Sequence, residues 1–325
     1  MNPTSLASIA NSYRLDPKQF EKQYKNHLSD FKQWNQYKHA DKWILIQKNI
    51  GTDLSIDEVA LSRGELYTII TNKKAHGKKG SLVAIMEGTK VNDIVQILKK
   101  IDLNKRKKVK EVTLDMSPAM ERIIKETFPC AYITTDRFHV QQLVSEAVQE
   151  VRLKYRRKAI KKENEKIEKA KKDNIKYIPK EYSNGDTKKQ LLARSRYLLF
   201  KPKSKWSDTQ KARAEILFKE FPEIEHAYNL SMMFRNCYEL GIDKNDAKNR
   251  FDKWYKKIEE ENIKEFNTCV STVKAYQETI LNYFIGRNTN ASAESFNSKI
   301  KGFRSIVRGV SDKKFFLFRL YKIYG

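Results

Sequence analysis

The chain has 325 residues, enough for two domains or for one domain with a large insertion. Its 65 Lys and Arg against 40 Asp and Glu give a net charge of +25, which favours a polyanionic partner, nucleic acid above all, over a basic protein without such a partner. No apolar run approaches the roughly 20 residues of a spanning helix and no signal peptide is recognised, so a membrane or secreted protein is not expected.

Two short helices are expected between residues 4 and 30, with the second opening at Asp16-Pro17 and carrying Phe20 and Tyr24 on one face. This spacing is that of a helix-turn-helix, which would lay the second helix on DNA. Simple helical packing is an equal alternative. The polar and aromatic segment 30–40 is interpreted as a linker.

From residue 43 to residue 136 the apolar residues alternate mostly with the period of β-strands. Two helices interrupt them, one over Val91–Ile101 and one that opens at Ser117-Pro118 and ends at Phe128. The order of three strands, helix, strand, helix, strand predicts a ribonuclease-H-like mixed sheet with flanking helices, an α/β fold. The expected strands are 54–61 (with a slip near Asp57-Glu58), 66–72, 81–88, 109–115 and 131–135.

A basic turn, Asn72–Gly80, lies between the second and third of these strands. It contains two glycines and reads as the tip of a hairpin. Contact with phosphate and a plain solvated loop both remain open for it.

Strand signals almost vanish beyond Arg137, which predicts a large all-helical insertion. Residues 138–176 read as one long Lys-rich helix, and its charges favour a solvated face over a direct grip on DNA. Further helices are expected over 187–200, 207–220, 223–240, 244–260 and 263–285. The expected segments are a helical N-terminal segment 1–40, the first part of the core 41–140, the insertion 141–285, and closing core helices 286–325.

Three carboxylates are candidates for one metal site: Asp57 within the first strand, Asp115 at the end of the fourth, and Glu294 on a late helix. An acid inside a β-forming run is costly unless a cation meets it. Hard oxygen ligands suit two Mg²⁺ or Mn²⁺ ions, which together serve in-line phosphoryl transfer. Taken singly, each acid is more often a turn former, a cap or a solvated side chain. Asp53 and Glu58 remain rivals for Asp57.

Two further groups accompany this candidate site. Asp136 ends the fifth strand and His139 follows one helical turn later, so that support of the site and simple helix capping are equal alternatives. Basic residues after Glu294 are candidates to hold DNA near the metals, with a solvated helix face as the alternative; they are Lys299, Lys301, Arg304 and Arg308.

The sequence resembles the DDE transposases of bacterial insertion sequences, in the branch with a long helical insertion between the second and third carboxylates. The resemblance covers about residues 40–325 and rests on the stretches around Asp57 and Asp115, on Asp136-Arg137-Phe138-His139-Val140, and on Asn290 to Lys301. It implies a magnesium-dependent, DNA-binding enzyme that cuts element ends and joins them to a target. It also implies Asp57, Asp115 and Glu294 as the catalytic triad, with Asp136 and His139 in support.

The chain departs from that family at its N-terminus, where members usually carry a cysteine-rich zinc module. Only about 40 residues without cysteine precede the catalytic strands, so either end recognition is reduced or a separately encoded N-terminal protein supplies it. The resemblance implies a homodimer on DNA. The three scattered cysteines, Cys130, Cys237 and Cys269, fit a reducing compartment, the bacterial cytoplasm and its nucleoid. The rival functions are a ribonuclease-H-fold nuclease without joining activity and a non-catalytic DNA-binding protein derived from a transposase.

Overall fold

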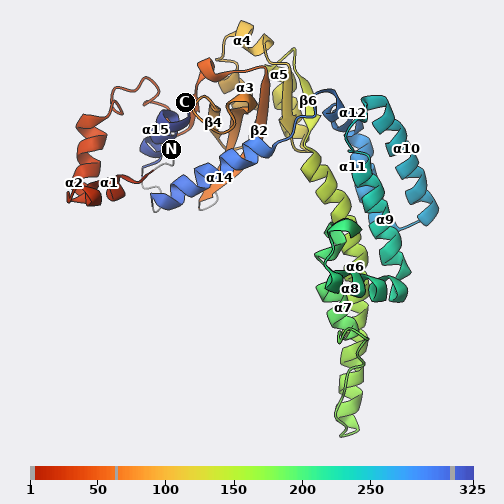
Figure 1. Cartoon of the computed structure of the whole chain (residues 1–325). Coiled ribbons are helices and arrows are strands. Elements are labelled where there is room, and N and C mark those ends of the chain that lie inside the picture. The colour runs from red at the N-terminus through yellow and green to blue at the C-terminus, as the bar shows by residue number, and fades with distance from the viewer. Residues whose placement is uncertain (1–3, 63–64, 308–311) are drawn as a thin grey trace. The chain divides into compact units, whose positions relative to one another are not determined.

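A computed structural model of the chain describes residues 4–62, 65–307 and 312–325. The chain divides into two compact units (Figure 1). One unit combines Met1–Asp136 with Arg287–Gly325, and the other is Arg137–Gly286. Among the described residues, no helix is both long enough and apolar enough to cross a membrane.

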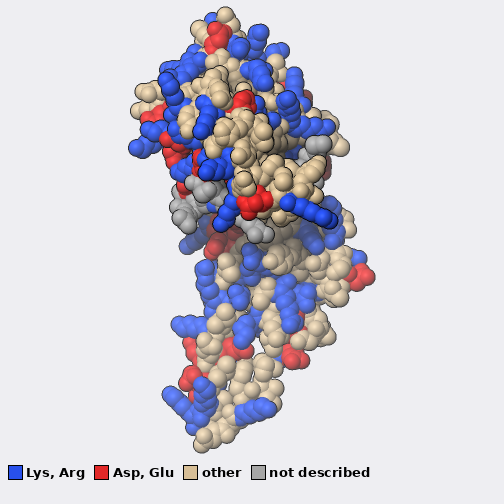
Figure 2. Space-filling model, turned by 90° about the vertical axis from the view of Figure 1, so that its left-hand side faces the viewer, with Lys and Arg blue, Asp and Glu red and all other residues tan. Residues whose placement is uncertain are grey.

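Positive charge is spread along the whole chain and is not confined to one tail. Figure 2 shows Lys and Arg side chains scattered over most of the displayed face, with the acidic side chains fewer and in small groups. The chain has 65 basic and 40 acidic residues, and this excess of basic residues is visible as a broadly basic surface on the face shown.

One six-stranded sheet forms the centre of the first unit, with the strand order β1-β4-β3-β2-β5-β6. The neighbours β1/β4, β4/β3 and β3/β2 are antiparallel, whereas β2/β5 and β5/β6 are parallel. The parallel strands need helical crossovers, which α3 to α5 provide. This mixed sheet with flanking helices is the ribonuclease-H-like α/β fold predicted from the sequence. The strands are β1 (Trp43–Leu45), β2 (Asp53–Ser62), β3 (Glu65–Asn72), β4 (Leu82–Glu87), β5 (Glu111–Leu114) and β6 (Tyr132–Thr135).

Helices cover both faces of this sheet, because β2 presents apolar side chains alternately to each. Leu54 and Ile56 belong to the core that α3 and α5 cover, while Val59 and Leu61 belong to the core that α14 and α15 cover. Figure 1 shows α14 running beside β2. The helices of this unit are α1 (Leu6–Ser12), α2 (Pro17–Gln23, continued by a π-helical turn Tyr24–Leu28), α3 (Val91–Leu98), α4 (Leu103–Lys107), α5 (Pro118–Thr127), α14 (Ala291–Ile306) and α15 (Lys313–Tyr324).

The segment 30–40 is not a linker, and this interpretation of the sequence was wrong. Phe31 and Trp34 are buried in the core on the α15 side of the sheet. The Phe31 ring lies 5.1 Å from that of Phe315, and the Trp34 ring lies 5.4 Å from that of Phe318. The apolar surface that buries this segment comes from residues nearly 300 positions later, so no local pattern could show it.

Smaller departures concern the edges of elements. The irregularity in β2 falls between Ala60 and Ser62 and not near Asp57-Glu58, where the pairing with β3 is continuous. β1 and α4 were not expected, since three and five residues leave too short a pattern. The single helix expected over 263–285 is three helices, α11, α12 and α13.

The second unit is all-helical and is organised on α6. Val140, Val144, Val148 and Val151 recur on one face of α6 and are buried, and α6 packs against α7 and α9. Beyond Arg152, α6 buries no residue before it ends at Lys172. Its helices are α6 (Arg137–Lys172), α7 (Lys188–Arg194), α8 (Asp208–Glu220), α9 (Pro222–Asn236), α10 (Lys244–Glu261), α11 (Asn267–Ala275), α12 (Gln277–Leu281) and α13 (Tyr283–Gly286).

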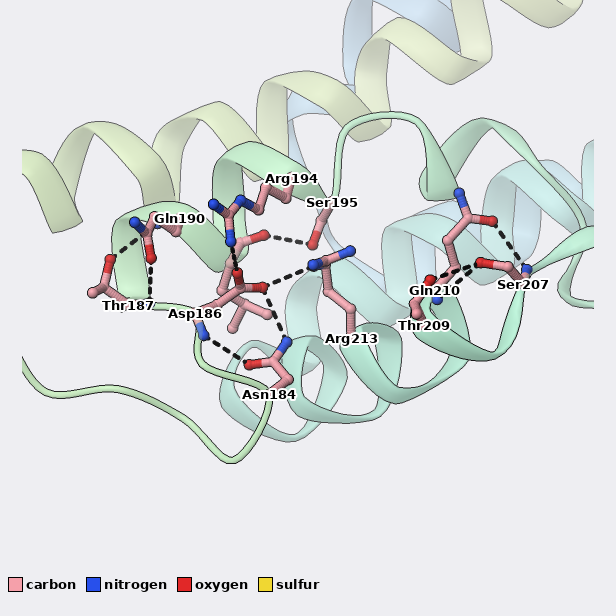
Figure 3. Close-up of polar contacts among 11 residues, drawn as sticks. Asn184, Asp186, Thr187, Gln190, Arg194, Ser195, Ser207, Thr209, Gln210 and Arg213 are labelled. Atoms are coloured by element: carbon pink, nitrogen blue, oxygen red, sulfur yellow. Dashed lines mark hydrogen bonds and ion pairs between the residues drawn. The ribbon is translucent and has the colours of Figure 1, made fainter.

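A buried carboxylate, Asp186, joins α7 to α8 in this unit (Figure 3). Arg194 of α7 donates to Asp186 Oδ1, and Arg213 of α8 donates from Nε to Asp186 Oδ2 at 2.8 Å. Both helices also begin with a capping box, formed at α7 by Thr187 with Gln190. Local hydrogen bonds therefore fix where these two short helices start and how they meet.

Candidate active site

Three aspartates lie at matching positions on three neighbouring parallel strands: Asp57 is within β2, and Asp115 and Asp136 directly follow β5 and β6. The pairing of β2 with β5 ends at Ser55 and Thr113. Continued by two residues in the same register, it sets Asp57 beside Asp115. β5 and β6 pair in a register that, continued by one residue, sets Asp115 beside Asp136. The Asp136 amide extends this ladder by donating to the Leu114 carbonyl at 2.9 Å. Since neighbouring strands lie about 4.8 Å apart, the aspartates form a row about 10 Å long.

This row faces α14. Asp57 lies on the same face of β2 as Val59 and Leu61, whose side chains belong to the core that α14 and α15 cover. At one end of the row, the Asn290 amide at the start of α14 donates to Asp136 Oδ1 at 3.1 Å. At the other end, the Asn297 side-chain amide donates to Asp57 Oδ2.

Glu294 lies between these two anchor points on α14. The helical rise from Asn290 to Asn297, seven steps along α14, is about 10.5 Å, which matches the two strand spacings between β6 and β2. The first two turns of α14 therefore cross the row of aspartates, with Glu294 midway between their ends. The Glu294 side chain is exposed, and its backbone amide donates to the Asn290 carbonyl at 3.0 Å.

A ligand group suited to a divalent cation surrounds Asp136. Asp115, Asp136 and His139, which is in the first turn of α6, each offer one ligand atom, and these atoms lie within 4.8 Å of one another. Asp136 is 1% exposed, and its buried Oδ2 has no hydrogen-bond partner in the described part of the chain. Burying a carboxylate oxygen in this way is costly without a cation. Two carboxylates and one imidazole can together hold a divalent cation, so these residues fit a metal.

Buried polar side chains support the row from the β5 strand. Lys73 is 8% exposed and donates from Nζ to Thr113 Oγ1, two residues before Asp115. Burial lowers the pKa of Lys73. The negative charges of Glu111, Asp53 and Asp136 raise the pKa, but they do not offset the effect of burial. Glu111 itself is 1% exposed.

Glu111 receives its own donors. The Tyr132 hydroxyl donates to Glu111 Oε2 at 3.0 Å, and the Asn288 amide donates to the same oxygen. Burial, with Glu111 beside it, raises the pKa of the Tyr132 hydroxyl to about 12, so this phenol stays a proton donor. The segment before α14 is thus tied to β5 through Glu111 and to β6 through Asp136.

Comparison with known proteins decides the family. Residues 54–320 match a family model described as a transposase, the ISL3 group of DDE transposases. The chain belongs to this transposase family. No curated protein and no solved structure matches it. A DDE transposase family implies the use of a divalent metal, which agrees with the ligand group around Asp136.

The two rivals of Asp57 in the transposase lie elsewhere. Asp53 stands four residues before Asp57 on β2, where it pairs with Lys74 at 3.4 Å and accepts from the Thr52 hydroxyl at 2.6 Å. Glu58 points to the opposite face of β2 and is exposed. Partial burial, followed by the charge of Asp57, raises the pKa of Glu58. Neither rival is at the register position that Asp57 shares with Asp115.

The basic residues after Glu294 differ from one another. Lys299 donates from Nζ to the Gly77 carbonyl at 2.8 Å and so ties α14 to the β3–β4 turn. Lys301 is exposed, and Arg304 is half-buried beside Leu61 and Tyr67. Arg308 lies outside the described residues.

Sequence reasoning missed the residues that place the carboxylates. Asn297 belongs to the stretch that carries the family resemblance but was given no role of its own, and it is buried against Asp57. Lys73 was expected in a turn open to phosphate or solvent but is buried against β5. Asn288 and Glu111 carried no motif, and Asn290 only opened the stretch that carries the family resemblance. The one available signal was the cost of burying a polar residue inside a strand, which applies to Glu111 as it does to Asp57.

Proposed function

We propose that this transposase cuts DNA strands at the ends of an insertion element and joins them to target DNA, with Mg²⁺ or Mn²⁺ as cofactor. The observation that carries the proposal is the row of Asp57, Asp115 and Asp136 with the Glu294 segment of α14 across it. Asp57, Asp115 and Glu294 are proposed as the DDE carboxylates, and Asp136 and His139 as their neighbours in the ligand group. Two ions held there would stabilise the attacking and leaving oxygens of an in-line displacement.

The chain's own residues orient this site. Asn297 and Asn290 donate to Asp57 and Asp136, so each carboxylate keeps one fixed direction. The Lys73 ammonium lies among the carboxylates of the site and offsets part of their mutual repulsion. No covalent protein–DNA intermediate is needed, so no Ser or Tyr nucleophile is proposed.

The test uses the full chain, duplexes bearing element ends and a supercoiled target plasmid. We expect strand cleavage and joined products in Mg²⁺ or Mn²⁺, and neither product in EDTA. Asp57→Asn, Asp115→Asn and Glu294→Gln should each abolish both products while binding of the duplex stays near wild type. Glu58→Gln is the matched control, because it removes one carboxylate next to Asp57 on the opposite strand face, and it should retain activity.

Each other outcome has a definite meaning. Nicked plasmid that is never joined would favour the nuclease alternative. DNA binding without any cleavage in Mn²⁺ would favour the non-catalytic alternative. Equal loss of binding and cleavage in Asp57→Asn would overturn the separate roles given to the carboxylates and to the basic surface.

The assembly on DNA is a second part of this proposal. A homodimer on paired ends is supported by the membership of a transposase family. Light scattering of the chain with and without end duplexes should show a dimer only with DNA. A monomer on DNA at saturating duplex would contradict the dimer.

A further inference from the structure

One face of α6 is polar where a helix inside a bundle is normally apolar. Residues at intervals of three or four line an open cavity of about 1030 Å³ within the helical unit. From Phe138 to Arg156 this face rises by about 27 Å, which is long enough for several consecutive phosphates of a DNA strand. The residues of α6 on this face are Phe138, Gln141, Gln142, Ser145, Glu146, Gln149, Arg152, Leu153 and Arg156.

Four arginines converge on this cavity, which we name the arginine groove: Arg152 and Arg156 of α6, Arg196 after α7, and Arg235 of α9. None of the four has a carboxylate within ion-pairing distance in the described chain. Glu146 is the single acid of the lining, and its carboxylate accepts from Gln142 at 2.9 Å. The groove therefore carries a net positive charge, with four arginines against one glutamate.

Some polar atoms of the groove are held by hydrogen bonds, whereas others have no hydrogen-bond partner among the described residues. Arg152 is 4% exposed and is held by Gln149 and by the Leu192 carbonyl, with donor distances of 2.7 and 2.8 Å. Arg156 Nε and both polar atoms of the Gln141 amide are buried and have no hydrogen-bond partner among the described residues. Arg156 Nε and Gln141 Nε2 are donors, and buried donors without partners are costly, so these two atoms point to a ligand that accepts hydrogen bonds.

The electrostatics favour an anion. Burial first, and then the like charges of Arg156 and Arg196, lower the pKa of Arg152 to about 10. A bound anion would remove this repulsion. By contrast, Arg194 and Arg213 of the same unit each form an ion pair with Asp186 (Figure 3).

The rim of the groove adds aromatic surface. Phe138 and Tyr197 are 60% and 66% exposed, and the Arg196 guanidinium lies 5.4 Å from the centre of the Tyr197 ring. Arginines beside exposed rings are the combination that contacts phosphates and sugars of a nucleic acid strand.

We propose that the arginine groove of the helical unit is a binding site for the phosphodiester backbone of DNA, with Arg156 and Arg196 contacting phosphates and Arg152 as a fixed charge beneath them. The ligand class rests on the proposed function, since DNA is the substrate proposed there. The groove adds a backbone contact that is distinct from the carboxylate site.

The test measures DNA binding by the full chain in EDTA, where cleavage does not occur. Fluorescence anisotropy of a labelled duplex gives the affinity at a series of salt concentrations. The variant Arg156→Gln/Arg196→Gln removes two partly accessible charges and leaves the buried Arg152 in place. The matched control, Arg157→Gln/Lys248→Gln, removes two exposed charges of the same unit that lie outside the groove.

In the groove variant, we expect the magnitude of the slope of log affinity against log salt concentration to fall by about 1.8. The affinity near 0.1 M salt should fall by about 50-fold. The control should stay within about 2-fold of wild type, because unlocalised surface charges contribute little at this salt. Arg196→Lys keeps the charge and should keep the slope. Circular dichroism and thermal unfolding check the fold, and the exposed single variant Arg196→Gln, with half the expected change, serves if the double variant is unstable.

Equal effects of the groove and control variants would overturn this inference while leaving the proposed function intact. A wild-type chain that binds no duplex would instead overturn DNA as the substrate. A groove variant that loses affinity without any change in slope would also contradict phosphate contact, because counter-ion release would then be unchanged.

Discussion

Asp136 is the carboxylate of the candidate site with the most clearly defined surroundings. One oxygen accepts from the Asn290 amide and the other is buried next to ligand atoms of Asp115 and His139. Asp136→Asn keeps the shape but removes the charge. If Asp136 supports the site and Glu294 completes the triad, cleavage should fall by about 10–100-fold in Asp136→Asn. Glu294→Gln should remove it altogether.

Metal titration of the cleavage assay separates these roles. In Asp136→Asn the Mg²⁺ concentration for half-maximal cleavage should rise, and added metal should restore part of the rate. Complete loss in Asp136→Asn together with an active Glu294→Gln would exchange their roles, so that Asp136 would be the third carboxylate.

Lys73 offers a test of the buried polar layer beneath the site. It stands next to Lys74, whose side chain is 67% exposed. Lys73→Met should cost about 2 kcal/mol of unfolding free energy, because it breaks a charged hydrogen bond to Thr113 and leaves Glu111 without a nearby cation. Lys74→Met should change the unfolding free energy by less than about 0.5 kcal/mol.

The pH dependence of this difference has a defined sign. Burial holds the pKa of Lys73 below its ordinary value of 10.5, so the unfolded chain binds the proton more readily than the folded chain does. The contribution of Lys73 to stability therefore grows as the pH rises toward 10.5, and the gap between wild type and Lys73→Met should widen there. Urea unfolding at several pH values measures it, and a gap that narrows would contradict the burial of a charged lysine.

At the scale of elements, Asp186 fixes the junction of α7 and α8 (Figure 3). Asp186→Asn should destabilise the helical unit by about 3 kcal/mol, because it leaves two guanidinium groups without their carboxylate. Asp252→Asn, on the exposed face of α10, is the matched control and should be nearly neutral. Thermal unfolding of the full chain provides the comparison.

Low pH should remove the difference in stability between wild type and Asp186→Asn. Burial opposes the charge of Asp186, but the hydrogen bonds from Arg213 and Arg194 outweigh it and leave the pKa below 3.8. A lowered carboxylate pKa gives stability that is fully present above the unfolded value and is lost as the pH falls through the folded value. Wild type and Asp186→Asn should therefore differ by a constant amount above about pH 5 and converge below pH 3.8.

The position of α14 is the second test among the elements. Asn297 ties α14 to Asp57, whereas the neighbouring Ser298 is exposed. Asn297→Ala should raise the Mg²⁺ concentration needed for cleavage and reduce the rate by about 10–100-fold, because the orientation of Asp57 is lost. Ser298→Ala should cleave like wild type, and DNA affinity should be unchanged in both. An unaltered metal requirement in Asn297→Ala would show that this contact only packs the helix.

Local pattern was sufficient for some elements and not for others. β2 to β6 and the strand-end positions of Asp115 and Asp136 could be predicted, because alternation and the acid that ends each strand are local features. The parallel pairing of β2 with β5, which sets Asp57 beside Asp115, was not fixed by the order of the elements and is given by the structure. Burial of segment 30–40 could not be predicted, since α15 supplies the apolar surface for it from the other end of the chain.

The residues that orient the candidate site were beyond prediction for the same reason. The Asn290 backbone amide and the Asn297 side chain gain their partners, Asp136 and Asp57, from more than 150 positions earlier in the chain. An asparagine on a helix has no periodic signature, so only the folded chain shows which one is a partner of a carboxylate. Lys73 likewise looks like part of a solvated basic turn until β5 is placed beside it.

For the whole molecule, charge is the property that a single experiment can test. A net charge of +25 that is spread over the surface should neutralise many phosphates at once (Figure 2). If 6–10 phosphates are contacted, the affinity for duplex DNA should fall by about 10³–10⁵ between about 50 and 200 mM salt. Anisotropy titrations in EDTA measure this, and potassium glutamate in place of chloride controls for anion binding to the protein. A slope below about 3 would mean that most of the basic surface lies away from DNA, so that the few contacts left would be those of the arginine groove and of α14.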